Sequence, residues 1–68
     1  MRILEKTEMK RLPGSFSCVF QFKRHDRCTE FVDWLKNENL LYEHLDYNLL
    51  RTVITDKQLT MLALTFAE

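Results

Sequence analysis

The sequence predicts a single small α+β domain, residues 1–68, in which an antiparallel sheet packs against helical segments as a two-layer sandwich. Three observations lead to this prediction. A turn sequence precedes a stretch of alternating apolar and polar residues, apolar residues then recur at helical spacing, and a later stretch is rich in leucine and β-branched residues. The expected order is an N-terminal antiparallel β-hairpin, an amphipathic helix, a further strand, and a C-terminal helix or strand.

The first predicted element is the hairpin. Residues 12–15, LPGS, have proline and glycine at the positions that a type II turn requires. In 16–22, FSCVFQF, every second residue is phenylalanine or cysteine, which predicts a strand with one apolar face. Pairing back through the turn sets Thr7 near Phe20 and leaves Lys6 on the opposite, charged face of the sheet.

The second predicted element is an amphipathic helix. Its apolar stripe follows the i, i+3, i+4, i+7 pattern and consists of Cys28, Phe31, Val32 and Leu35. Asp26 is expected to cap the N-terminus with its carboxylate, and Asn39 can close the C-terminus in the left-handed conformation. Within the basic stretch FKRHDRC, 22–28, the helix therefore gives Asp26 and Cys28 structural roles.

The C-terminal half has a less regular pattern. The segment 40–47 fits a loop, a short strand or a helical turn, whereas 48–55, NLLRTVIT, predicts a strand. Residues 55–58, TDKQ, form a capping-box pattern ahead of apolar residues at helical spacing. The following residues, LTMLALTF at 59–66, also alternate as a strand would, so helix and strand both remain open for 56–68.

Composition excludes several classes of protein. Hydrophobic residues make up 46% of the chain, with one glycine and one proline, which is unlike a disordered segment. Two cysteines are too few for the disulfide framework of a small secreted domain. The sequence has no signal-peptide pattern and no run of 18 apolar residues. We therefore expect a cytoplasmic protein, in the host cytoplasm if it is viral, without membrane contact.

Candidate catalytic and metal-binding groups are sparse. The soft ligands Cys18, His25, Cys28 and His44 lack the short ligand pair that structural zinc sites use. Both cysteines fall on predicted core faces, which favours buried, unreactive thiols. The one glycine, already assigned to the turn, cannot form a phosphate-binding loop. We expect no enzymatic activity, no metal and no cofactor.

Protein binding is the favoured function. Trp34 lies at the margin of the helix stripe, Tyr42 and Tyr47 lie in the irregular stretch, and Trp and Tyr dominate interface energetics. Four residues of 22–28 have no predicted structural role. With these four, the predicted partner-binding residues are Lys23, Arg24, His25, Arg27, Trp34, Tyr42 and Tyr47.

The expected mode of action is stoichiometric association with a protein that presents an acidic surface. Net charge is zero, but residues 1–27 hold seven Lys/Arg against three acidic residues and the remainder reverses this, so the chain can steer a charged partner. Apolar residues in 49–66 exceed the need of one small core, which predicts self-association as a homodimer. By analogy, such a chain resembles the inhibitors that viruses and mobile elements direct against a host protein machine.

The alternative is binding of RNA or DNA through the basic N-terminal hairpin. Its expected contacts are Lys6, Lys10, Lys23, Arg24 and Arg27. The aromatic rings of the hairpin are expected in the core and not exposed for base stacking, so this alternative ranks below protein binding.

Overall fold

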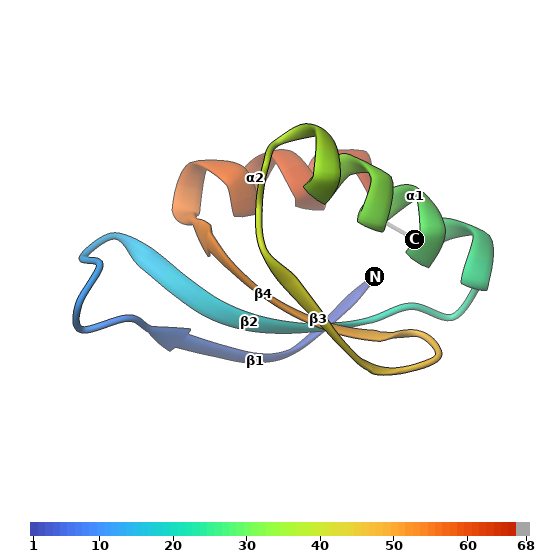
Figure 1. Ribbon diagram of the computed structural model, residues 1–68, viewed down its shortest axis with the longest axis horizontal. Helices are drawn as coiled ribbons and strands as arrows, with labels where there is room; N and C mark the ends of the chain where they lie inside the picture. Colours follow the sequence, from blue (N-terminus) through green and yellow to red (C-terminus); the bar gives the residue numbers. More distant parts are fainter. Residues whose placement is uncertain (67–68) are drawn as a thin grey trace.

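Four antiparallel strands and two helices form the computed structural model, which describes residues 1–66 (Figure 1). In chain order the elements are β1 (Arg2–Glu8), β2 (Ser15–Gln21), α1 (His25–Asn37), β3 (Tyr42–Asp46), β4 (Leu49–Thr55) and α2 (Asp56–Thr65). The strand order in the sheet is β1-β2-β4-β3, so β1 and β3 are the edges. Both helices lie on one face of the sheet, and the predicted two-layer α+β arrangement is confirmed (Figure 1).

The turn in the β1–β2 hairpin has the predicted geometry. The Ser15 N–H donates to the Leu12 carbonyl at 3.0 Å, and Gly14 has a φ of 86°, which L side chains rarely adopt. A second turn precedes it, because the Leu12 N–H donates to the Met9 carbonyl at 3.2 Å. The connection between the strands is therefore longer than one turn.

This longer connection changes the register of the hairpin. Thr7 pairs with Ser17 and Lys6 pairs with Cys18, so the prediction that Thr7 lies near Phe20 is wrong. Lys6 consequently lies on the helix-covered face and not on the opposite face. There its ammonium contacts Asp56 at the start of α2 at 3.3 Å and lies 4.4 Å from the centre of the Phe16 ring.

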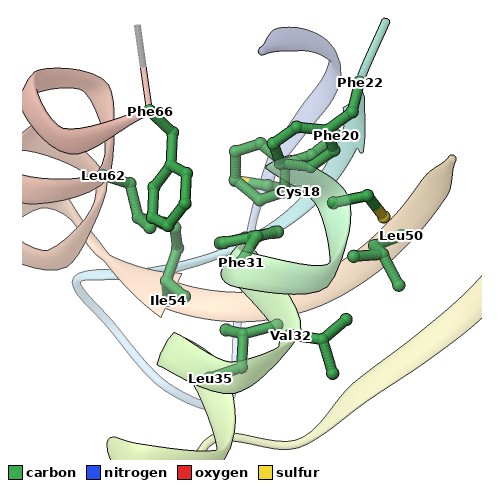
Figure 2. Packing of buried hydrophobic residues seen from close by; sticks show 11 residues of the cluster. Cys18, Phe20, Phe22, Phe31, Val32, Leu35, Leu50, Ile54, Leu62 and Phe66 are labelled. Carbon is green, nitrogen blue, oxygen red and sulfur yellow. The ribbon is translucent and has the colours of Figure 1, made fainter. Parts of the chain in front are cut away.

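The core lies between the sheet and the helices and is built from the predicted faces. All four residues of the predicted α1 stripe are buried. Phe31 is at the centre of this core, with its ring centroid 5.1 Å from that of Phe20, 5.2 Å from Phe22 and 5.5 Å from Phe66 (Figure 2). Edge-to-face and tilted aromatic pairs of this kind add to the stabilisation that buried apolar area provides.

The C-terminus of α1 ends in a Schellman motif. Asn39 has a φ of 57°, as predicted for the residue that closes the helix. The Asn39 N–H donates to the Lys36 carbonyl at 3.1 Å, and the Leu40 N–H donates to the Leu35 carbonyl at 2.9 Å. Leu40 then packs against the core, and the chain turns into β3.

The segment after β4 is a helix up to Thr65, which decides between the helix and the strand that the sequence left open. Residues 67 and 68 lie outside the described part. The capping box of this helix is complete. The Gln58 N–H donates to Thr55 Oγ1 at 3.2 Å, and the Thr55 N–H donates to Gln58 Oε1 at 2.9 Å. These contacts favour a helix over the alternating strand pattern.

Four of the ten apolar residues in 49–66 are buried in the core, and Leu59 packs against it. In β4 the residues Leu50, Thr52 and Ile54 are buried, as are Leu62 of α2 and Phe66, the residue directly after this helix. The buried Thr52 hydroxyl donates to the Leu41 carbonyl at 2.6 Å, so its polar atom is satisfied. The apolar excess that predicted self-association is therefore smaller than the sequence indicated.

Between residues 1 and 66 no helix has both the length and the apolar character needed to cross a membrane.

We expect Thr55→Ala to lower the free energy of unfolding by about 0.5–2 kcal/mol, because it removes the side-chain acceptor of the capping box. Thr60→Ala is the matched control, since Thr60 lies on the exposed side of the same helix and alanine has the higher helix propensity. Urea unfolding of both variants measures the difference. Equal destabilisation by the two substitutions would contradict the role of the cap.

Candidate functional site

The basic stretch 22–28 forms the corner between β2 and α1. Phe22 is buried in the core and Cys28 is the first buried residue of α1, as predicted. The N-cap is Arg24, with an extended backbone and no side-chain cap hydrogen bond, so the prediction that Asp26 is the N-cap is wrong. Asp26 lies within the first turn, where its negative charge still complements the helix dipole.

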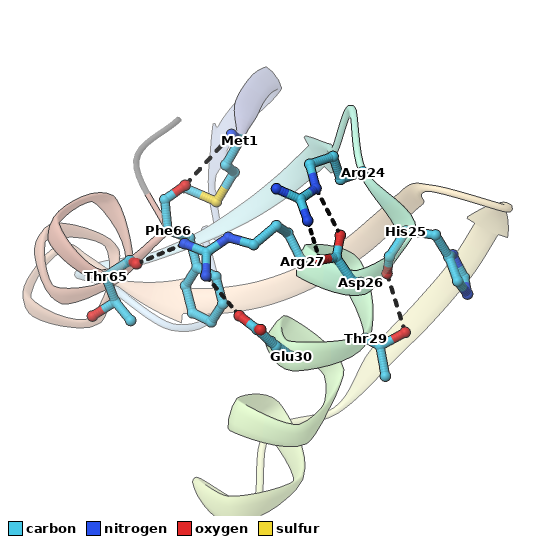
Figure 3. Close-up of polar contacts among 9 residues, drawn as sticks. All are labelled: Met1, Arg24, His25, Asp26, Arg27, Thr29, Glu30, Thr65 and Phe66. Carbon is cyan, nitrogen blue, oxygen red and sulfur yellow. Dashed lines mark hydrogen bonds and ion pairs between the residues drawn. The ribbon is translucent and has the colours of Figure 1, made fainter.

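Asp26 is the second residue of α1, and its carboxylate pairs with Arg24. The guanidinium of Arg24 donates from Nε to Asp26 Oδ1 at 3.1 Å and from Nη2 to Oδ2 at 2.6 Å. This bidentate pair engages both carboxylate oxygens at the surface (Figure 3). The cation of Arg24 is thus balanced locally.

Arg27 has a structural role that the sequence did not reveal. It donates from Nη1 to Glu30 Oε2 at 2.6 Å and from Nη2 to the Thr65 carbonyl at 3.1 Å. Its guanidinium carbon lies 5.3 Å from the centre of the Phe66 ring. Arg27 therefore joins α1 to the C-terminal end of α2, and in Figure 3 it points away from the side on which His25 lies.

His25 joins the corner to the β3–β4 hairpin. Its ring stacks on that of Tyr47, with centroids 3.9 Å apart and an interplanar angle of 12°. Its Nδ1 is 2.9 Å from Asn48 Oδ1, and because this oxygen can only accept, Nδ1 donates. We call His25, Tyr47 and Asn48 the hairpin-tip cluster.

The hairpin-tip cluster is exposed and lies beside a hollow. Tyr47 is 67% exposed although its ring stacks on His25. The hollow has a volume of about 290 Å³ and is lined on β2 and the hairpin by Gln21, Phe22, Asp46, Tyr47, Asn48 and Leu49. Nearby in the chain, Lys23 is exposed, and within residues 1–66 its ammonium makes no ion pair. A large amphipathic ring, a cation and a hollow thus share one end of the molecule.

Four of the seven predicted partner-binding residues meet at this end, namely Lys23, Arg24, His25 and Tyr47. The other three do not join them. Arg27 faces α2, Trp34 is half-buried with its ring stacked on Phe31, and Tyr42 is half-buried on β3 with its ring edge-on to that of His44. Trp34 and Tyr42 contribute mainly to the margin of the core.

The basic residues of the nucleic-acid alternative fall into two separate groups. Lys10 lies in the β1–β2 loop and Lys6 is paired with Asp56, whereas Lys23, Arg24 and Arg27 follow the far end of β2. The length of β2 separates Lys10 from the second group by about 20 Å at the rise of a strand, and Lys6, opposite Cys18 in the middle of the hairpin, is already paired with Asp56. The five cations therefore do not form one continuous track for a phosphate backbone.

Both thiols are in the core. Cys18 and Cys28 are fully buried and unpaired with each other, and burial raises the pKa of each thiol above its usual value. A raised pKa keeps the thiols protonated near neutral pH and disfavours nucleophilic attack. Across the part of the chain that the structure describes, no three His, Cys, Asp or Glu side chains are placed to hold a metal ion.

Sequence reasoning missed Asn48, which fixes the ring of His25. The sequence did carry a signal for it, because Tyr47 and Asn48 form the tight turn directly after Asp46, the last residue of β3, and aspartate and asparagine favour turns. That signal identifies a hairpin. It does not reveal which side chain from elsewhere packs against the turn.

Comparison of the chain with protein-family models, with curated proteins and with solved structures found no match.

Proposed function

We propose that this protein is a non-enzymatic protein-binding module that acts by stoichiometric association, with the hairpin-tip cluster at the centre of the contact surface. The observation that carries the proposal is the exposed ring of Tyr47 beside a hollow. Tyrosine is enriched among the few residues that provide most of the binding energy in protein interfaces. An exposed ring of this kind offers apolar area to a partner together with a hydroxyl at its tip.

The geometry also keeps the cost of binding low. Stacking on His25, which is itself bonded to Asn48, restricts the Tyr47 ring before any partner arrives. Ordering a side chain on association costs about 0.5–1.5 kcal/mol, and a preordered ring avoids much of this loss. The cluster therefore supports a surface that is formed in advance.

The charges at this end favour a partner with an acidic surface. Arg24 is balanced by Asp26, whereas Lys23 has no such counter-ion within the described residues. An acidic group on the partner would complete the pairing of Lys23 and speed association by electrostatic steering. We place this association in the cytoplasm, where two buried, reduced thiols are stable.

Inhibition is the form of activity that we propose for such association. A module that covers a functional surface of a larger protein machine blocks it without chemistry of its own, as inhibitors from viruses and mobile elements do. This part of the proposal concerns the partner, and a competition assay on the captured machine would test it.

The experiment is site-specific photocrosslinking in native cytosol. A photoreactive phenylalanine analogue replaces Tyr47 in one variant and Thr60 on α2 in the control. We expect one adduct of defined mass and fixed stoichiometry from position 47 and none from position 60. Adducts of the same pattern from both positions, or none from position 47, would contradict the proposed surface.

A further inference from the structure

The outer edge of β1 carries a second interaction surface. Every residue of β1 is exposed, including Ile3 at 40% and Leu4 at 44%, and among residues 1–66 β1 pairs on one side only, with β2. An edge strand presents backbone N–H and C=O groups to any strand that can align with it. This edge lies across the sheet from β3 and the hairpin-tip cluster, so both surfaces can be occupied at once.

The hydrogen bonds of the hairpin show which residues face outward. The Met9 N–H donates to the Ser15 carbonyl at 2.9 Å, in the same register as the Thr7–Ser17 pair. In an antiparallel pair, every second residue exchanges backbone hydrogen bonds with the neighbouring strand. Thr7 therefore directs its backbone groups toward β2, whereas Lys6 and Glu8 direct theirs toward the outer edge.

The side chains of these two outward residues lie on one face of the sheet. Lys6 pairs with Cys18 and Glu8 pairs with Phe16, both of which face the helices. A bulge interrupts the register between Ile3 and Glu5, which limits the regular edge to the stretch from Glu5 to Glu8. The edge is short. The charges of Lys6 and Glu8 determine the register in which another strand can pair with it.

Two β1 edges can align antiparallel in three ways that pair their outward residues. Lys6 can face Lys6 of a second copy, Glu8 can face Glu8, or Lys6 can face Glu8. The first two place like charges directly opposite each other, which is destabilising, and the third pairs opposite charges twice because of the two-fold symmetry. The edge is therefore complementary to itself in one register.

We propose that β1 pairs with β1 of a second copy of this chain, with Thr7 on the two-fold axis and Lys6 opposite Glu8 of the other copy. The sheet would then continue through both copies. The other edge strand, β3, does not offer this complementarity, because its carboxylates, Glu43 and Asp46, have no lysine or arginine beside them in the strand. The resulting dimer would present two hairpin-tip clusters and bind a repeated partner surface with increased avidity.

Charge exchange tests the register in solution. Sedimentation equilibrium of the wild-type chain from micromolar to millimolar concentration should show a monomer–dimer equilibrium. We expect Lys6→Glu and Glu8→Lys each to weaken dimerisation at least about fivefold, because each places like charges opposite one another. The double variant should recover the dimer, although it does not recover the contact between Lys6 and Asp56. Recovery of the dimer by the double variant would therefore show that the single variants act on the pairing between the two copies and not on folding.

A disulfide trap tests the axis independently. Across it, Thr7 would face Thr7 of the second copy as a pair without mutual hydrogen bonds, with Cα atoms about 4.5 Å apart. This separation suits a disulfide. Thr7→Cys should therefore form a covalent dimer under mild oxidation much faster than Glu5→Cys, which is equally on the exposed strand but distant from the axis. Cys18 and Cys28 are buried and do not interfere.

A wild-type chain that stays monomeric at millimolar concentration would overturn the proposal. It would equally be overturned by a dimer whose affinity is unchanged by the charge reversals, or by equal oxidation rates at positions 5 and 7. Since none of these measurements involves Tyr47, they leave the proposed contact surface for a protein partner untouched.

Discussion

Phe31→Ala is expected to destabilise the fold by about 3–5 kcal/mol, because it deletes the ring at the centre of the core and leaves a cavity. A chain of 68 residues has a total stability of about 3–10 kcal/mol. The variant should therefore lose between about a third and all of its free energy of unfolding. Circular dichroism with urea titration measures this loss directly.

Leu64→Ala is the control for Phe31→Ala. Leu64 is also a large apolar residue on a helix, but it is 82% exposed. Its removal should change the free energy of unfolding by less than about 0.5 kcal/mol. If Phe31→Ala were tolerated as well as Leu64→Ala, the core would not be centred on Phe31.

Tyr47→Ala is expected to weaken binding of the protein partner at least about 30-fold, which corresponds to about 2 kcal/mol. The side chain is exposed, so the same substitution should leave the unfolding midpoint nearly unchanged. Tyr47→Phe retains the ring that stacks on His25 and should keep most of the affinity. Isothermal titration calorimetry with the purified partner, once crosslinking has identified it, measures the affinity of each variant.

Met61→Ala provides the matched surface control for Tyr47→Ala, since Met61 is a half-exposed apolar residue on α2, away from the hairpin tip. It should not alter partner affinity. If Met61→Ala weakened binding as much as Tyr47→Ala, the contact surface would include α2 and the proposed site would be misplaced.

Much of the fold could be predicted because local patterns determine it. The LPGS turn, the apolar stripe of α1, the left-handed Asn39 and the capping box at Thr55 each depend on a few neighbouring residues. The residue types that form these features can be recognised in the sequence alone. The structure confirms each of these features, and with them the two-layer arrangement.

The errors share a different cause, which is competition between partners. Asp26 is a good N-cap residue, but α1 begins one residue earlier, at His25, and Arg24 binds the carboxylate of Asp26. The hairpin register depends on a second turn at Met9, which carries no strong turn signal. In each case two locally acceptable arrangements exist, and a contact that the pattern does not encode selects between them.

The candidate site could be predicted only where its residues are neighbours in the sequence. Lys23, Arg24 and His25 lie together because they are adjacent in the sequence, and the sequence predicts them as a group. Their proximity to Tyr47 and Asn48 depends on how β3 and β4 dock on β2, which no local pattern specifies. The joining role of Arg27 likewise requires the end of α2 to lie beside α1.

The strand order also has a consequence for how the molecule folds. The β1–β2 and β3–β4 pairs are hairpins that close over short connections, but β2 and β4 pair across the whole of α1 and β3. Hairpins form in about 1–10 μs, whereas pairing between distant segments must first offset a larger loss of chain entropy. We therefore expect the β2–β4 pairing to limit the folding rate.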